Sequence, residues 1–309
     1  MKRHLLLAEC LNTPWALIPE RLATYSSVLH RWSSGVAAPD DVMAGIEADK
    51  SARAAKRAAN VAAGSGGIAV LPLYGVVTQR GNMMDDLSGP GSCSTQNFAD
   101  ALNAALADDT VGQILIDIDS PGGSVYGVAE LGAQILAARA QKPVVAVANS
   151  LAASAAYWIG SQAGEFYITP GGEVGSIGVY MMHQDVSAMM EAEGVKTTFI
   201  KAGEFKTEGN PYQPMDDAAQ AYLQTRVDDY YGAFTKAVSK GRNVGIDQVR
   251  NGMGQGRVLG ASDALAQNMV DGIATFDEVI GKMQKQGKAA QRTGASRVAR
   301  ANREIDILG

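Results

Sequence analysis

From Ile68 onward, short apolar segments alternate with segments of helical pattern, and this alternation limits the possible folds more than any other feature of the chain. The expected strands are IAVLPLYGVV from Ile68, GQILIDID from Gly112 and PVVAVAN from Pro143. The expected helices span Asn97 to Ala107, Tyr126 to Ala140, and a segment that starts near Leu151. Strands that alternate with helices form βαβ units on a largely parallel sheet. The sequence therefore predicts an α/β fold.

The composition is that of a globular protein of about two folding units. The chain has 309 residues, of which 46% are hydrophobic and 19% are charged, so a mostly disordered chain, a collagen and a polytopic membrane protein are excluded. The formal net charge is −5, and attraction of the whole molecule to nucleic acid is therefore not expected. We expect no specific nucleic-acid partner.

Cysteine usage and hydropathy favour a cytoplasmic protein. The two cysteines, Cys10 and Cys93, cannot form a disulfide framework, and no His/Cys cluster offers zinc ligands. The apolar run from Leu5 to Ala8 is cut by Glu9 and is too short for a secretion signal. An uncharged stretch lies between Lys142 and Glu165, but its polar residues favour a buried strand, a turn and a buried helix over a membrane span. We expect a cytoplasmic chain with no membrane span.

Composition divides the chain into three parts. Residues 1–63 are expected to form an N-terminal helical arm that packs on the domain or binds a partner, and the glycine-rich break that starts at Gly64 ends it. Residues 64–281 form the main domain, which includes a long amphipathic helix over Asp216 to Lys240. Residues 282–309 form a basic tail that we expect to be disordered and solvated; contact with nucleic acid or an acidic partner is the alternative.

The first candidate for chemistry is the turn Asp119-Ser120-Pro121-Gly122-Gly123-Ser124, between an expected strand and an expected helix. Two glycines after a proline free the backbone to direct N–H groups at an anionic oxygen. A plain βα turn would also use glycine, and a phosphate loop is disfavoured because no G-x-x-x-x-G-K-[ST] pattern is present. Asp117 and Asp119 project from one face of the strand and could form a carboxylate pair for a metal or acid catalysis; Asp119 is better interpreted as a brace for the turn.

The second candidate is Ser154, where a strand end runs into a helix through small residues only. Its alanine neighbours leave room for a substrate carbonyl, and the N–H of Ala155 can join an oxyanion site. A capping or packing serine is the alternative interpretation.

A nucleophilic serine needs a base, and the histidines do not supply an obvious one. His4 and His30 lie in the arm, His183 follows two methionines, and none belongs to a G-x-S-x-G signature, so a Ser-His-Asp triad is disfavoured. Lysine can serve only where burial lowers its pKa. Of the two lysines in FIKAGEFKT, Lys206 follows an aromatic residue, whereas Lys201 is close to Glu204 and stays charged more easily; either could also be a surface lysine.

Five segments, in this order, resemble the signal peptide peptidase A family of Ser/Lys peptidases, including its shorter branch of phage capsid-maturation (prohead) proteases. The segments are IDSPGGSV, SLAASAAYWIG, VGSIGVY, IKAGEFKTEGNP and GRVLGASDALAQNMVDGI, and together they cover about Ile68 to Ile280. The arm residues Asn12 to Ala16 also resemble the phage branch.

The resemblance assigns roles to individual residues. Ser154 matches the nucleophile, Lys206 the general base, and Ser176 the serine that orients the lysine. Gly123, with Gly122 beside it, matches the oxyanion-hole glycine, and the N–H of Ala155 would be the second donor. The family commonly has two glycines after the nucleophile, and here Ala155 and Ala156 stand there, which puts substrate size in doubt.

The resemblance also implies the fold of the caseinolytic protease and crotonase superfamily, a βαβ spiral that assembles into homo-oligomeric rings. In single-repeat members the lysine of one subunit faces the serine of its neighbour. The implied reaction is peptide-bond hydrolysis through an acyl-enzyme, with no cofactor and no metal.

Four functions follow as hypotheses. The first is a phage prohead protease, in the host cytoplasm and the prohead, that cleaves scaffold, portal or capsid proteins. The second is a peptidase that digests cleaved signal peptides. The third is an inactive shell or scaffold component, against which the presence of Ser154, Ser176 and Lys206 together argues. The fourth is a crotonase-like acyl-CoA enzyme, in which a Ser/Lys pair would have no role.

Overall fold

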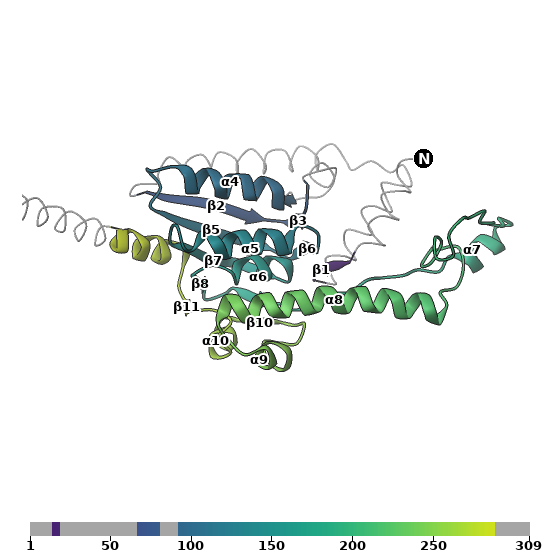
Figure 1. Cartoon of the computed structure of the whole chain (residues 1–309). Coiled ribbons are helices and arrows are strands. Elements are labelled where there is room, and N and C mark those ends of the chain that lie inside the picture. Colours follow the sequence, from purple (N-terminus) through teal and green to yellow (C-terminus); the bar gives the residue numbers. More distant parts are fainter. Residues whose placement is uncertain (1–13, 19–66, 81–91, 288–309) are drawn as a thin grey trace, which may run out of the picture.

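The structure is a computed structural model, and it describes residues 14–18, 67–80 and 92–287 (Figure 1). Most of the expected N-terminal arm and the tail beyond residue 287 lie outside the described residues. One described part of the arm, β1 (Trp15–Leu17), is a strand and not a helix.

The main sheet has the strand order β10-β9-β7-β5-β2, and β8 pairs with β7 and β11 beside this path. β2 (Ile68–Tyr74), β5 (Gln113–Ser120) and β7 (Val144–Ala153) pair in parallel. β8 (Glu165–Ile168) and β9 (Glu173–Gly175) pair in parallel with successive parts of β7. β10 (Val258–Gly260) is antiparallel to β9, and β11 (Gly272–Ile273) is parallel to β8. The largely parallel sheet confirms the predicted α/β class.

Continuous apolar sequence places β5 and β7 at the centre of this sheet. Strands of a parallel sheet are covered on both faces, so they lack the polar alternation of a half-exposed strand. Residues 113–118 and 144–148 are accordingly buried. The helices α4 (Thr95–Ala107), α5 (Val128–Ala138) and α6 (Ala155–Gly160) contribute Phe98, Ile135 and Trp158 to the main core.

A smaller sheet has the order β1-β6-β3-β4, where β3 spans Val76–Thr78, β4 spans Ser92–Ser94 and β6 spans Gly122–Ser124. β6 is antiparallel to β1 and pairs in parallel with β3 at a single residue pair, Val77 and Gly123. This sheet therefore holds the glycine-rich turn predicted for anion binding.

The helix α8 (Asp217–Arg242) begins at the N-cap Asp216, whose carboxylate accepts the Ala219 N–H at 2.7 Å. Near its other end Phe234 stacks on Trp158, with ring centroids 4.7 Å apart. Figure 1 shows that α8 extends far beyond the sheets, and that α7 (Ser187–Ala192) lies near its distant end. Residues 181–216 and the start of α8 thus form a projecting segment, which we call the arm loop.

The remaining helices complete the body at the other end of α8. They are α9 (Ile246–Asn251), α10 (Ala261–Ala266) and a helix over residues 276–287. This last helix crosses the predicted boundary at residue 281, so residues 282–287 are helical where a disordered tail was expected. Met283 is buried there, its carbonyl accepts a hydrogen bond from Gln113, and Lys282 pairs with Glu165 at 2.7 Å.

The helix expected from Leu151 begins later than predicted. β7 continues to Ala153 because its last residues pair with β9, and α6 starts at Ala155. The interpretation of residues 142–165 as strand, turn and buried helix is otherwise confirmed. Among the described residues, no helix has the length and apolar character needed to cross a membrane.

Candidate active site

Ser154 lies at the single-residue junction between β7 and α6, with φ 55° and ψ −117°. A non-glycine residue rarely adopts this backbone conformation, because its Cβ is then crowded, and the cost is about 1–3 kcal/mol. Strain of this kind persists where the surroundings enforce it, and it is concentrated at functional sites. The backbone of Ser154 therefore distinguishes it from an ordinary capping serine.

Two backbone hydrogen bonds hold Ser154 in this conformation. Its N–H donates to the carbonyl of Gly175 at 2.7 Å, and its carbonyl accepts the Trp158 N–H at 2.9 Å. The first bond extends the register in which Ala153 pairs with Gly175. The strand pairing and the first turn of α6 together fix the residue.

The Ser154 hydroxyl is buried and has no hydrogen-bond partner among the described residues, and the residue is only 1% exposed. A buried polar atom without a partner costs about 1–3 kcal/mol, so such an atom calls for an explanation. A nucleophilic oxygen that awaits a base and a substrate supplies one. The hydroxyl does not cap α6, which excludes the capping interpretation.

Ser176 lies beside Ser154, one residue beyond Gly175. It also has a positive φ, 53°, and its N–H donates to the Arg257 carbonyl at 2.7 Å. The structure therefore brings the two serines predicted from separate motifs to the ends of neighbouring parallel strands.

The glycine turn contacts Ser154 from the side of the smaller sheet. Gly122 has φ +95°, and a Cβ built on it would lie 2.9 Å from the Cβ of Ser154. A Cβ on Gly123 would lie 1.9 Å from the carbonyl oxygen of Val77. Any larger side chain at either position would displace the turn, so both glycines are required here.

Ser120, which was not among the predicted site residues, braces this turn through its side chain. Its hydroxyl donates to the Gly75 carbonyl at 2.6 Å and accepts the Gly122 N–H at 3.2 Å. Asp119 contributes its backbone carbonyl, which accepts the Gly75 N–H at 3.0 Å. A serine two residues before a turn glycine is a known local brace and could have indicated this role.

Ala155 and Ala156, the departure from the family pattern, are fully buried. Ala155 is the first residue of α6, where a helix N–H has no partner within the helix. The Ala155 N–H thus has the position expected of an oxyanion donor next to Ser154.

Lys206 is not brought to Ser154 within one chain. It lies in the arm loop with an exposed side chain, and its N–H donates to the Gly203 carbonyl at 3.3 Å. Its neighbour Phe205 is 64% exposed, so a single chain does not provide the burial expected around this lysine. Lys201 is also exposed, and its ammonium donates to the Glu204 carbonyl at 2.7 Å.

No histidine replaces the lysine among the described residues. The ring of His183 lies 3.0 Å from the carbonyl oxygen of Asn210, inside the arm loop. His4 and His30 lie outside the described residues.

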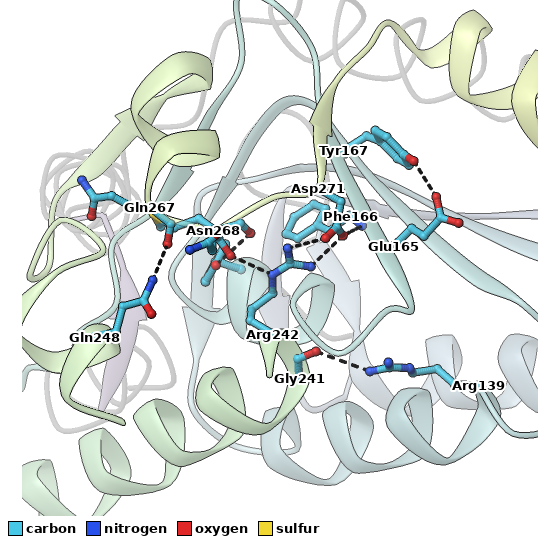
Figure 2. Close-up of polar contacts among 12 residues, drawn as sticks. Arg139, Glu165, Phe166, Tyr167, Gly241, Arg242, Gln248, Gln267, Asn268 and Asp271 are labelled. Atoms are coloured by element: carbon cyan, nitrogen blue, oxygen red, sulfur yellow. Dashed lines mark hydrogen bonds and ion pairs between the residues drawn. The ribbon is translucent and has the colours of Figure 1, made fainter. Parts of the chain in front are cut away.

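The arm loop is attached to the body through α8, and Figure 2 shows the contacts near the C-terminal end of this helix. The Arg242 guanidinium binds both carboxylate oxygens of Asp271 at 2.8 Å, and one of these oxygens accepts the Phe166 N–H at 2.7 Å. Arg139 donates to the Gly241 carbonyl at 3.4 Å. α8 is thus fixed at one end and carries the arm loop at the other.

The pKa of Asp271 reflects these contacts. Partial burial acts to raise the pKa, but the hydrogen bonds from Arg242 and from the Phe166 N–H outweigh it and hold the pKa below its usual value. The carboxylate is therefore ionised wherever the domain is folded near neutral pH.

The structure does not support a metal site at Asp117 and Asp119. Asp117 is buried and accepts a hydrogen bond from the hydroxyl of Tyr74, whereas Asp119 is exposed. Throughout the described part of the chain, no three His, Cys, Asp or Glu side chains are grouped in a way that could hold a metal ion.

Comparison with known proteins identifies the family. Residues 137–290, which include Ser154, Ser176 and Lys206, match the model of Peptidase family S49. Among solved structures, the chain is similar to a ClpP1 mutant from Listeria monocytogenes, with 15% identity and a TM-score of 0.43 over 67% of this chain and 91% of that chain.

Two relatives come from phages. The chain is 32% identical to "Capsid assembly protease C" of Escherichia phage lambda, over 69% of this chain and 48% of the relative. It is 30% identical to "Head-tail preconnector protein GP5" of Enterobacteria phage P21, over 84% of this chain and 52% of the relative. The chain thus spans about half the length of each.

A third relative is bacterial. The chain is 27% identical to "Putative signal peptide peptidase SppA" of Enterococcus faecium, over 73% of this chain and 65% of the relative. With its match over residues 137–290 and these relatives, the chain belongs to peptidase family S49.

Proposed function

We propose that this chain is a serine endopeptidase in which Ser154 attacks the peptide bond and Lys206 of a neighbouring subunit acts as the general base. The observation that carries the proposal is the Ser154 hydroxyl, which is buried, unpartnered and held on a strained backbone. It combines with Ser176 and the glycine turn in one site.

In the proposed reaction, the neutral amine of Lys206 accepts the hydroxyl proton as the Ser154 oxygen attacks the peptide carbonyl. The N–H groups of Gly123 and Ala155 stabilise the resulting oxyanion, and the lysine ammonium returns its proton to the leaving amine. Water then hydrolyses the acyl-enzyme. Ser176 holds the lysine amine in place.

Assembly is part of this proposal because the isolated chain leaves the base in solvent. The arm loop exposes Lys206 and several large apolar side chains, which are Phe199, Ile200, Phe205 and Tyr212. Docking of this loop on a second copy of the chain would bury these side chains and remove water from the lysine. Burial disfavours the charged ammonium and so favours the neutral amine that a general base needs. We propose a homo-oligomeric ring as the active form.

The substrate we propose is protein of a phage capsid, such as scaffold, portal or capsid chains, processed in the host cytoplasm or the prohead. The two phage relatives support this role, and the alignment with GP5 extends over 84% of this chain. A signal-peptide-degrading peptidase is the second candidate, supported by the Enterococcus faecium relative at a similar identity.

The test is cleavage of a denatured protein by the purified full-length chain, followed on gels. Ser154→Ala and Lys206→Ala should each reduce the rate by about a thousandfold or more, as removal of catalytic groups does in other serine hydrolases. Lys201→Ala is the matched control, since it removes an exposed lysine from the same loop, and it should leave the rate unchanged.

Cleavage at wild-type rate by Ser154→Ala or Lys206→Ala would contradict the proposal. A comparison of cleavage rates distinguishes the two proposed roles. One kind of substrate is capsid and portal protein from the same gene cluster, and the other is synthetic signal peptide. Faster cleavage of the signal peptides would favour the second candidate.

A further inference from the structure

The strand β1 lies between the glycine turn and the segment after Ser176, and we call the place that it occupies the channel. On one side it pairs with β6, with Trp15 opposite Ser124, Ala16 opposite Gly123 and Leu17 opposite Gly122. On the other side the Trp15 N–H donates to the Tyr180 carbonyl at 2.9 Å, and the Tyr180 N–H donates to the Trp15 carbonyl at 3.0 Å. An extended segment is thus held by backbone hydrogen bonds along both of its edges.

The alternation of these hydrogen bonds turns the backbone N–H and carbonyl of Ala16 toward Gly123, the predicted oxyanion donor. The N–H and the carbonyl of Trp15 both bond to Tyr180. In an antiparallel pattern successive residues bond to opposite sides, so the N–H and the carbonyl of the next residue point toward β6. The flanking bonds agree, because the Val125 N–H donates to the Pro14 carbonyl at 3.3 Å and the Ile18 N–H to the Pro121 carbonyl at 3.2 Å. Ala16 therefore faces Gly123.

The carbonyl of Ala16 also lies beside the candidate nucleophile. A Cβ built on Gly122 would lie 2.3 Å from the Ala16 carbonyl oxygen and 2.9 Å from the Cβ of Ser154. The Ala16 oxygen and the Ser154 side chain therefore lie on the same side of Gly122, close to each other. Trp15, Ala16 and Leu17 are all buried, and Ser154 is closed to solvent. A backbone carbonyl of this chain thus occupies the space next to Ser154 that a substrate carbonyl would need.

We infer that residues 14–18 are an internal ligand of the peptide-binding channel, and that this segment must leave before a substrate strand can pair with β6. The inference rests on the proposed function, because it takes Ser154 as the nucleophile. β1 is the terminal strand of the smaller sheet, so its departure would expose the edge of β6. Extended peptides bind open sheet edges by adding a strand.

The sequence of β1 indicates which peptides would fit in its place. Ala16, at the position next to Ser154, is fully buried, and so are Ala153, Ala155 and Ala156, which flank Ser154 in the chain. The channel should therefore take peptides with a small residue beside the nucleophile and large apolar residues on either side, as in Trp-Ala-Leu.

The test measures binding and does not depend on catalysis. A fluorescein-labelled peptide with the sequence of residues 12–20, NTPWALIPE, is titrated by anisotropy into full-length Ser154→Ala protein, with and without Trp15→Ala and Leu17→Ala. Loosening β1 should tighten binding by about tenfold or more, because apparent affinity scales with the fraction of open channels. Phe98→Ala is the matched control, since it removes a buried aromatic ring from α4, and it should not change binding.

Equal affinity with β1 intact and loosened would overturn the inference, and so would the absence of binding to every variant. If the double substitution prevents folding, Leu17→Ala alone should still increase the affinity relative to Phe98→Ala. The same peptide in scrambled order should bind none of the variants.

Different experimental results would refute the role of β1 and the proposed function. Peptide binding that appears on loosening β1, with no Ser154-dependent cleavage, would refute the proposed function alone. Ser154-dependent cleavage whose rate is the same with β1 intact and loosened would refute the inference alone.

Discussion

Ser154 and Ser176 lie at the ends of two neighbouring parallel strands, and the 2.7 Å hydrogen bond from the Ser154 N–H to the Gly175 carbonyl links the backbone at one serine to the residue before the other. Both serines have a positive φ. The site therefore places two hydroxyl-bearing residues side by side at the cost of backbone strain.

That strain predicts a stability gain on substitution. At φ 55° and ψ −117°, glycine is unstrained because this conformation mirrors an ordinary extended one. Ser154→Gly should be more stable than Ser154→Ala by about 1–2 kcal/mol, or a few degrees in Tm, while both are inactive. Thermal unfolding measures the difference. An equal Tm for the two variants would show that residue 154 is not strained.

Gly175 should tolerate no side chain. It has φ +123°, and a Cβ there would lie 2.8 Å from the Arg257 carbonyl oxygen. Gly175→Ala should lower the free energy of unfolding by about 1–3 kcal/mol and also reduce activity, because the carbonyl that fixes Ser154 moves. Gly171→Ala is the control, since its Cβ meets nothing within 4 Å. Chemical denaturation and peptide hydrolysis would test the pair, and similar losses in both variants would contradict this account.

Ser176 is predicted to act by positioning Lys206. Ser176→Ala should lower kcat by about tenfold to a hundredfold with little change in KM, and should move the acidic limb of the pH profile, because the lysine amine that acts as the base loses its partner. Ser161→Ala is the control: it removes a buried hydroxyl that bonds the Trp158 carbonyl at 2.8 Å, outside the site. An unchanged kcat and pH profile in Ser176→Ala would exclude the positioning role.

The Arg242–Asp271 pair predicts a pH-dependent anchor for α8. The folded-state pKa of Asp271 is lowered, so its contribution is complete above the ordinary carboxyl pKa of about 3.9 and is lost as the pH falls through the folded value. The Asp271 side chain is 40% exposed, so screening reduces the expected cost of Asp271→Asn at pH 7 to about 1 kcal/mol, or about 2–4 °C in Tm.

The measurement is the Tm of Asp271→Asn and wild type between pH 7 and pH 3. The difference should shrink as the pH falls below 4. Asp229→Asn, which changes an exposed carboxyl in the middle of α8, should show no difference at either pH. A cost for Asp271→Asn that grows in acid would contradict the assignment of a lowered pKa.

The parallel sheet was predictable because its strands are long apolar runs, and β2, β5 and β7 lie close to their predicted positions. The placement of Ser154 and Ser176 at the ends of neighbouring strands was not predictable from spacing, because it depends on the pairing of β7 with β9. β1 was missed because three residues carry no periodicity, and their strand conformation comes from β6 and Tyr180. We expected burial around Lys206, whereas its side chain is exposed in the single chain, and we propose that a second copy covers it.

We propose that Lys206 of another subunit activates the Ser154 hydroxyl, and mixing two inactive variants distinguishes this arrangement from a dyad within one chain. Ser154→Ala and Lys206→Ala chains are combined, subunit exchange is confirmed by native mass spectrometry, and cleavage of a denatured protein is followed. The mixed oligomers should regain activity, because some interfaces then pair an intact serine with an intact lysine. Confirmed mixed oligomers that stay inactive would contradict it.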